Sequence, residues 1–206
     1  MQLLANTTSP FVRIARTAMI EKGIDVEPTL VDPWVDDARL RAANSATRVP
    51  TLVLDDGTPL VECLLIVQWL EFARPSPGWP SLVGQGPTVT GILSRTGIAI
   101  GAIEASTITI ITRKVTAPML FDETPVGLRR RRSMAEGMQR LEAQAGAIAA
   151  SGTPMLDAIT AVTLYDYQQM RFANQPWLPA TPRLKALAEV WNSRPSFART
   201  KPYVLG

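Results

Sequence analysis

The sequence contains no histidine and a single cysteine, Cys63, among its 206 residues. The lack of histidine excludes Ser-His-Asp and Cys-His catalysis and removes the commonest protein ligand of a catalytic zinc ion. One cysteine permits neither an internal disulfide nor a Cys-x-x-Cys redox or zinc motif. Any chemistry must therefore use hydroxyl groups, backbone amides, carboxylates, arginines or a bound cofactor.

Long apolar runs are absent as well. No segment approaches the roughly 18 consecutive apolar residues of a membrane-spanning helix. The first residues, MQLLANTTSPFVR, lack the basic and apolar regions of a secretory signal. These features predict a cytoplasmic protein without a membrane partner. Hydrophobic residues still make up 46% of the chain, which supports a folded core and excludes a disordered chain.

Charge is distributed unevenly along the chain. Residues 1–80 carry 7 basic and 10 acidic side chains, whereas residues 81–206 carry 14 and 8, which gives net charges of −3 and +6. This difference indicates two domains. The four consecutive arginines at 129–132 have no interleaved aromatic residues. We interpret them as a solvated helix face and expect no nucleic-acid partner.

Residues 1–73 have the pattern of a compact α/β domain. Ser9 is suited to be an N-cap, with Pro10 in the first helical position, and Gly23 is the expected stop. The Asp-Gly pair at 56–57 is a strong hairpin signal. The pattern predicts strands at 1–5, 26–31, 51–54 and 58–61, and helices at 10–22, 36–44 and 62–73. The first strand, helix and second strand form a βαβ unit with parallel strands.

The second half of the chain is predicted to be mainly helical. Proline and glycine punctuate residues 75–87, which indicates a linker. Helices are predicted at 134–150, 155–172 and 182–192. Residues 98–112 (IAIGAIEASTITIIT) are rich in β-branched side chains, so local propensity favours a strand there.

Four motifs resemble those of the glutathione S-transferase family. TSPFVRIARTAMIEKGI is similar to the family's first β-α turn, and Arg48-Val49-Pro50 to the segment that carries its cis-proline. Glu62-Cys63 is similar to the acid-serine pair that begins its third helix, and residues 194–202 to the tail of bacterial members. The resemblance implies a thioredoxin-like α/β domain at 1–76, a linker at 77–86 and an all-α helical domain at 87–206, with residues 98–112 helical.

The resemblance also implies an activity. A glutathione S-transferase transfers alkyl or aryl groups: it conjugates glutathione to an electrophilic small molecule, or exchanges thiols with it, in detoxification. Glutathione is then a co-substrate that supplies the nucleophilic sulfur, and no metal is expected. The sequence contains no readable motif for the second substrate.

Ser9 is the candidate catalytic residue. A hydroxyl group and the amide-rich start of a helix both favour a thiolate over a thiol, whose pKa is ordinarily about 8.5. The spacing explains Ser9 equally well as a plain N-cap. Thr7 and Thr8 are nearby substitutes for a role toward the sulfur.

The resemblance implies that further residues bind glutathione. The main chain of Val49, before a cis Pro50, would pair with the cysteinyl part like an edge strand, although an X-Pro bond is ordinarily trans. Glu62 would accept from the γ-glutamyl ammonium, or is simply an acid favoured in the first turn of a helix. Arg48 would approach the glycyl carboxylate, and Phe11 would line the acceptor pocket.

Two positions depart from the family pattern. Cys63 replaces a serine and has three interpretations: a weak donor whose backbone N–H binds the γ-glutamyl carboxylate, a thiol of lowered pKa that forms a mixed disulfide with glutathione, or a buried inert thiol. Pro154 stands three residues before Asp157, where a capping Ser or Thr is expected, and Thr153 is one step away.

Two functions remain open at this stage. The intact motifs favour an enzyme, whereas the two departures and the basic second half are compatible with a non-catalytic protein-interaction module of the same fold, similar to the stringent starvation protein. The resemblance implies a homodimer in which the glutathione-binding domain pairs with the partner's helical domain. The opposite net charges of the two halves suit this pairing, or equally packing within one subunit.

Overall fold

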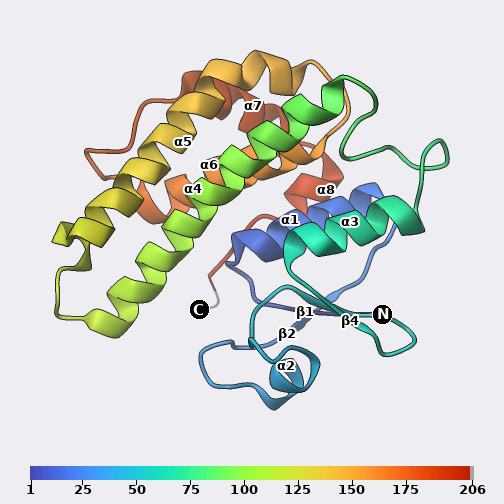
Figure 1. Cartoon of the computed structure of the whole chain (residues 1–206), viewed down its shortest axis with the longest axis horizontal. Coiled ribbons are helices and arrows are strands. Elements are labelled where there is room, and N and C mark those ends of the chain that lie inside the picture. Colours follow the sequence, from blue (N-terminus) through green and yellow to red (C-terminus); the bar gives the residue numbers. More distant parts are fainter. Residues whose placement is uncertain (205–206) are drawn as a thin grey trace. The chain divides into compact units, whose positions relative to one another are not determined.

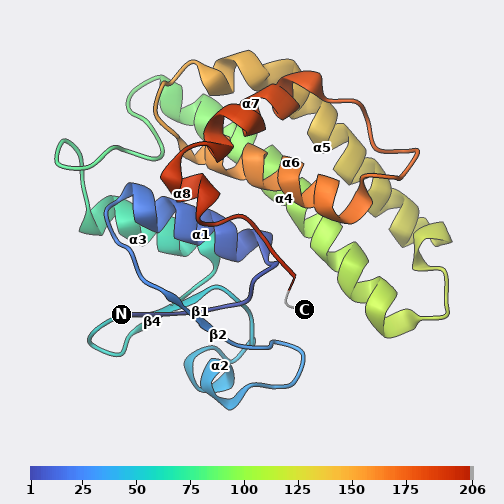
Figure 2. The ribbon, with the colours of Figure 1, turned by 180° about the vertical axis from the view of Figure 1, so that it is seen from behind.

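The computed structural model describes residues 1–204 (Figures 1 and 2). Its internal contacts divide the chain into two units. Residues 1–82 together with 193–206 form the N-terminal unit, and residues 83–192 form the helical unit. The division after residue 82 falls within the predicted linker. Residues 193–204 group with the N-terminal residues in this division of contacts.

A four-stranded sheet of order β2-β1-β3-β4 forms the base of the N-terminal unit. Its strands are β1 (Gln2–Ala5), β2 (Pro28–Leu30), β3 (Thr51–Val53) and β4 (Pro59–Val61). β1 runs parallel to β2 and antiparallel to β3, and β3 runs antiparallel to β4. The predicted βαβ unit and the predicted hairpin are therefore both confirmed.

Helices cover both faces of this sheet (Figure 1). α1 (Pro10–Glu21) and α3 (Cys63–Ala73) lie together on one face, and α2 (Ala38–Ala43) lies on the other. Leu40 of α2 packs against Leu4 of β1 in a buried cluster. Asp37 is the N-cap of α2 and accepts hydrogen bonds from the Arg39 guanidinium and two backbone amides, which lower the pKa of Asp37 to about 2.

The helical unit contains four long helices and a short 3-10 turn among its described residues. They are α4 (Thr88–Thr116), η1 (Phe121–Glu123), α5 (Pro125–Ala149), α6 (Leu156–Phe172) and α7 (Pro182–Asn192). α5 begins well before its predicted start at residue 134. Thr124 caps it by accepting from the Gly127 amide, and Pro125 occupies the first helical position. Within residues 1–204, no helix is long and apolar enough to cross a bilayer.

Residues 98–112 are helical, as the resemblance implied and local propensity did not. They lie inside α4, which packs against both α5 and α6. Ser106 and Thr109 donate their hydroxyl groups to the carbonyl oxygens of Ala102 and Ala105, four residues earlier, at 2.6 and 2.8 Å. These two buried hydroxyl groups thus find acceptors within the helix, and tertiary packing overrides the weak preference of β-branched residues for strands.

Polar links explain why the end of the chain groups with the N-terminal unit. α8 (Pro195–Ala198) lies inside the predicted tail motif. The carboxylate of Glu21, at the end of α1, accepts from the Arg194 guanidinium at 2.6 and 2.8 Å and from the Ser196 hydroxyl. The hydroxyl groups of Thr17 and Thr200, both buried, are 2.8 Å apart. These contacts hold the tail against α1.

A second carboxylate, the half-buried one of Glu71, acts at the same end of α1. The ammonium of Lys22 is fully buried and lies 2.7 Å from Glu71 of α3 and 3.0 Å from the Arg74 carbonyl oxygen. Glu71 also accepts from the Ser81 hydroxyl and the Leu82 amide, both at 2.9 Å. One acid thereby holds the C-terminal end of α1 and the start of the linker.

Candidate functional site

Three loops meet at one end of the sheet. Leu4 of β1 pairs with Thr51 of β3, and Thr51 pairs with Val61 of β4, so these residues form one row across the sheet. Because both neighbours run antiparallel to β3, the chain beyond this row leads to residues 6–9, 48–50 and 62–63 at the same sheet end. The structure therefore brings Ser9, Arg48–Pro50 and Glu62–Cys63 to the same end of the sheet.

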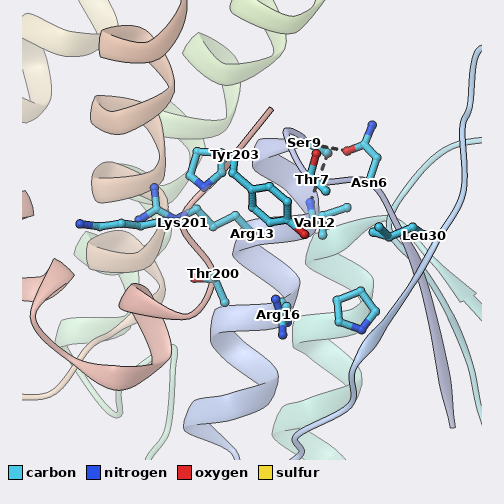
Figure 3. A pocket seen from close by; sticks show the side chains of 12 residues that line it. Asn6, Thr7, Ser9, Val12, Arg13, Arg16, Leu30, Thr200, Lys201 and Tyr203 are labelled. Atoms are coloured by element: carbon cyan, nitrogen blue, oxygen red, sulfur yellow. Dashed lines mark hydrogen bonds between the residues drawn. The ribbon is translucent and has the colours of Figure 1, made fainter. Parts of the chain in front are cut away.

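Ser9 lies in a loop whose backbone is held in place by hydrogen bonds to the loop's own side chains. The Asn6 side-chain oxygen accepts from the Ser9 amide at 2.9 Å, and Ser9 Oγ accepts from the Val12 amide at 3.3 Å (Figure 3). Ser9 is thus the N-cap of α1. A serine hydroxyl has one hydrogen and two lone pairs, and the cap bond uses only a lone pair. Capping α1 and donating to a ligand are therefore compatible roles for this residue.

A buried asparagine holds the segment that carries Val49. The Asn44 amide donates to the Arg48 carbonyl oxygen at 3.1 Å and to Thr51 Oγ1 at 3.0 Å. The Val49–Pro50 bond is cis, as the resemblance implied. The pairing of β3 with β1 ends at Thr51, so the main chain of Val49 lies beyond the last paired residue.

Glu62 has an unusual backbone conformation. It is the N-cap of α3 with φ 68° and ψ 127°, a region that residues other than glycine rarely adopt and that costs of order 1–3 kcal/mol. Its carboxylate lies 3.4 Å from the Arg48 guanidinium, and both side chains are exposed. Strained residues of this kind concentrate at ligand sites, which makes Glu62 a stronger candidate than its sequence position alone indicated.

Cys63 is the first residue of α3 and is 4% exposed. It forms no disulfide. This burial agrees with the interpretation of Cys63 as an inert thiol, and its backbone N–H still lies at the start of α3. α1 begins at Pro10, at the same end of the sheet. The N-termini of α1 and α3 therefore both lie where the loops meet, an arrangement that favours anionic ligand groups.

Phe11 is partly buried in the first turn of α1, two residues after Ser9. No group of three or more Cys, Asp or Glu side chains in the same part of the chain is arranged to hold a metal ion.

A small pocket borders the Ser9 loop on the side of β2. Its volume is about 40 Å³, and its walls come from the Ser9 loop, α1, β2 and residues 200–203 (Figure 3). Thr7, Ser9, Arg13, Leu30 and Tyr203 are among its lining residues, and none of residues 48–50 or 62–63 is. Ser9 therefore stands between this pocket and the loops at the sheet end.

Sequence reasoning missed three residues that support the Ser9 and Val49 segments. Asn6 carries a local signal, because an Asn three residues before a helix cap commonly accepts from the backbone of a turn. We recognised no local sequence signal for the roles of Asn44 and Tyr203. The Tyr203 amide donates to the Thr7 carbonyl oxygen from the far end of the chain.

Comparison with known proteins identifies the family. Residues 3–78 match the model of the glutathione S-transferase N-terminal domain. The chain is also similar over its length to a glutathione S-transferase from Methylobacterium radiotolerans JCM 2831 in complex with glutathione sulfonate, with 27% identity, a TM-score of 0.86, and coverage of 100% of this chain and 96% of that one. The chain belongs to the glutathione S-transferase family.

Two further relatives agree with the assignment to the glutathione S-transferase family. The Uncharacterized GST-like protein YibF of Escherichia coli (strain K12) is 26% identical over 208 residues, which cover 98% of each chain. A glutathione S-transferase from Methylobacillus flagellatus KT with GSH bound shares the fold, with 23% identity, a TM-score of 0.85, and coverage of 98% and 99%. The predicted family and the predicted fold, a thioredoxin-like domain followed by an all-helical one, are both confirmed.

Proposed function

We propose that this glutathione S-transferase family member binds reduced glutathione at the sheet end and uses Ser9 to stabilise its thiolate for reaction with an electrophilic small molecule. The observation that carries the proposal is the row Leu4-Thr51-Val61, from which the Ser9, Val49 and Glu62 loops all depart in one direction. The relative from Methylobacterium radiotolerans, which was crystallised with glutathione sulfonate, supports it.

Each loop offers groups that suit one part of the tripeptide. The Cys63 backbone N–H, at the start of α3, binds the γ-glutamyl carboxylate, and the Glu62 carboxylate accepts from the ammonium. The main chain of Val49 pairs with the cysteinyl residue. Arg48 binds the glycyl carboxylate. The exposed Arg48–Glu62 ion pair, 3.4 Å long, contributes little by itself, so both partners can exchange it for charged groups of the ligand.

The chemistry needs no histidine. The bound thiol loses its proton to solvent, and the Ser9 hydroxyl donates a hydrogen bond to the sulfur anion. This bond and the amides of α1 lower the thiol pKa from its ordinary value of about 8.5. The thiolate then forms a bond to the electrophilic atom of the second substrate, and the leaving group departs with its bonding electrons.

The Ser9→Ala variant tests this proposal. Hydrogen bonds to charged groups contribute about 1.5–3 kcal/mol. We therefore expect turnover of an activated aryl chloride at neutral pH to fall roughly ten- to hundredfold, while calorimetry with reduced glutathione gives a Kd within about twofold of the wild type. Thr124→Ala is the matched control, because it removes the N-cap of α5 in the helical unit without touching the site.

The outcomes separate the possible functions. Unchanged turnover in Ser9→Ala removes the role assigned to Ser9. If folded wild-type protein takes up no glutathione at saturating concentration, the enzymatic proposal fails, and the protein-interaction function becomes the leading one. The Cys63 departure would then be the first position to revert to serine.

We also propose that the protein forms a homodimer. α3 exposes a row of apolar side chains on its outer face: Leu64, Leu65 and Phe72 are 38%, 52% and 76% exposed. Leu65 and Phe72 are two helical turns apart and therefore on one side of α3. Sedimentation equilibrium at micromolar concentration distinguishes a dimer from a monomer, and a Phe72→Glu variant is expected to shift the equilibrium toward monomer.

A further inference from the structure

Residues 194–203, the tail, run along α1 and reach the loop that carries Ser9. Four contacts join the two segments, from the end of α1 to the loop before it: Glu21 with Arg194, Thr17 with Thr200, Arg16 with the Arg199 carbonyl oxygen, and Thr7 with Tyr203. The last of these lies two residues from Ser9. All of these residues belong to the N-terminal unit.

We infer that the tail is a positioning element for Ser9: the hydrogen bond from the Tyr203 amide to the Thr7 carbonyl oxygen, 3.2 Å long, holds the loop that presents the Ser9 hydroxyl. This inference rests on the function proposed above and adds a residue to it. Tyr203 acts through the Ser9 loop and does not touch the reacting atoms.

The tail is anchored firmly before it reaches this loop. Arg199 binds Asp25 through both terminal nitrogens, at 2.7 and 3.0 Å, a bidentate geometry that orients the two groups. The Thr17–Thr200 hydroxyl pair is buried, so separating its members would leave a polar group without a partner, which is costly. The backbone three residues before Tyr203 is thus fixed against α1.

The loop has two supports of different kinds. Inside the loop, Asn6 accepts from the Ser9 amide. From outside, the Tyr203 amide donates to the carbonyl oxygen of Thr7, which lies between Asn6 and Ser9. Figure 3 shows the side chains of these four residues. A pocket of about 40 Å³ lies beside this contact, and Thr7, Ser9 and Tyr203 are among its lining residues. The main-chain bond from Tyr203 is a direct link between the tail and the loop.

Losing this bond should misplace the Ser9 hydroxyl without removing it. A weaker hydrogen bond to the sulfur leaves the thiol pKa higher, so a smaller fraction of bound glutathione is thiolate at neutral pH. The groups proposed to hold the peptide lie in the two other loops, at 48–50 and 62–63. Glutathione affinity should therefore change little while the reactivity of its sulfur changes.

Tyr203→Pro is the direct test, because proline has no backbone N–H. The pH dependence of kcat/KM and the ultraviolet absorbance of the bound thiolate both report the thiol pKa. We expect the thiol pKa to rise, kcat/KM at pH 7 to fall about three- to tenfold, and the glutathione Kd to stay within twofold. At a pH above both thiol pKa values, the rates of variant and wild type should converge.

Two companion variants isolate the N–H group. Tyr203→Ala keeps the amide and removes the ring, so it must differ from Tyr203→Pro. Val204→Pro places proline one residue later in the same exposed tail and controls for a general effect of proline. Should Tyr203→Pro fail to fold, Thr200→Val, which breaks the buried hydroxyl pair that anchors the tail, is expected to raise the thiol pKa in the same direction.

The thiol pKa in the wild type and in the two Tyr203 variants distinguishes failure of this inference from failure of the proposed function. If wild-type protein lowers the thiol pKa and Tyr203→Pro leaves it equally low, the tail does not position Ser9, and the proposed function stands. If Tyr203→Ala raises the pKa as much as Tyr203→Pro, the ring and not the amide matters, and the inference is wrong. If the thiol titrates at its ordinary value in the wild type, the proposed function itself fails.

Discussion

The two units differ in how they hold their backbone. In the N-terminal unit, the carboxylates of Glu21, which is buried, and of Glu71, which is half-buried, bind segments outside the sheet: the tail and the start of the linker. All three non-glycine residues with positive φ among residues 1–204 lie in this unit, at positions 36, 47 and 62. Long-range polar links and local backbone strain thus characterise the unit that carries the candidate site.

The helical unit relies on close contact between helices. The Ser106 and Thr109 hydroxyl groups donate to carbonyl oxygens of their own helix, α4, and α5 approaches α4 closely at Gly137. A largely buried charge pair joins two of these helices: Arg95 of α4 binds Asp157 of α6 at 2.7 Å. Burial raises the pKa of Asp157, and Arg95 opposes this rise. We therefore expect single substitutions to lower the free energy of unfolding most at two kinds of position. In the N-terminal unit these are the residues that join segments distant in sequence, and in the helical unit they are the closest contacts between helices.

Glu71→Ala tests the first half of this contrast and should have the largest effect. It leaves the ammonium of Lys22 buried beside no carboxylate and removes the acceptor of the Ser81 hydroxyl and the Leu82 amide. Breaking a buried ion pair by removing one partner costs about 3–5 kcal/mol. We expect the free energy of unfolding, measured by urea titration, to fall by about this amount.

The control pair lies on the surface of α7. Lys185 and Glu189 are 3.9 Å apart, and both side chains are more than 60% exposed, at 63% and 67%. Glu189→Ala should change the free energy of unfolding by less than about 0.5 kcal/mol. Equal effects of the two variants would mean that Glu71 does not hold the N-terminal unit together.

Gly137→Ala tests the second half of the contrast. A Cβ atom at Gly137 would lie 2.7 Å from the Cβ of Ala102 on α4, closer than real contacts allow, so α4 and α5 would have to separate. Overpacking of this kind costs about 1–3 kcal/mol. We expect the free energy of unfolding to decrease by roughly 1–2 kcal/mol, because the better helix propensity of alanine offsets part of the cost.

Gly146→Ala, on the same helix, is the matched control. Nothing lies within 4 Å of the Cβ position there. Alanine should therefore stabilise α5 by about 0.5–1 kcal/mol through helix propensity alone. If Gly137→Ala were stabilising as well, close approach of α4 and α5 would not depend on this glycine.

The sequence predicted the N-terminal fold well because its signals are local. Ser9 with Pro10 marked the start of α1, and the Asp-Gly pair marked the β3–β4 hairpin. In the helical unit, local signals misled at residues 98–112, where β-branched residues suggested a strand. Only contacts with α5 and α6, which are distant in sequence, make that segment helical.

Some features of the candidate site follow from local sequence patterns, and others depend on distant parts of the chain. Ser9 and Glu62 could be proposed from motifs, because a cap and a helix start have local sequence patterns. The backbone strain at Glu62 could not, since φ is set by how β4 meets α3. The support of the Ser9 loop by Tyr203 was also unreadable, because it depends on where the tail returns.

Glu62→Gly should change stability less than Glu71→Ala or Gly137→Ala does, and it links strain to function. Glycine adopts positive φ without the steric cost, at the expense of greater chain entropy in the unfolded state. We therefore expect the free energy of unfolding to rise by about 0.5–1 kcal/mol. Glutathione affinity should fall roughly tenfold or more, because the proposed acceptor of the γ-glutamyl ammonium is gone.

Asp36→Gly is the control that separates strain from binding. Asp36 also has positive φ (52°), lies in the same unit and is exposed, but it is not among the residues proposed to bind glutathione. Its replacement should leave the glutathione Kd unchanged. A Glu62→Gly variant that is more stable and binds glutathione as tightly as the wild type would show that the strain at Glu62 serves no ligand. A variant that is more stable and binds weakly would show that the N-terminal unit keeps an unfavourable backbone conformation in order to place a ligand group.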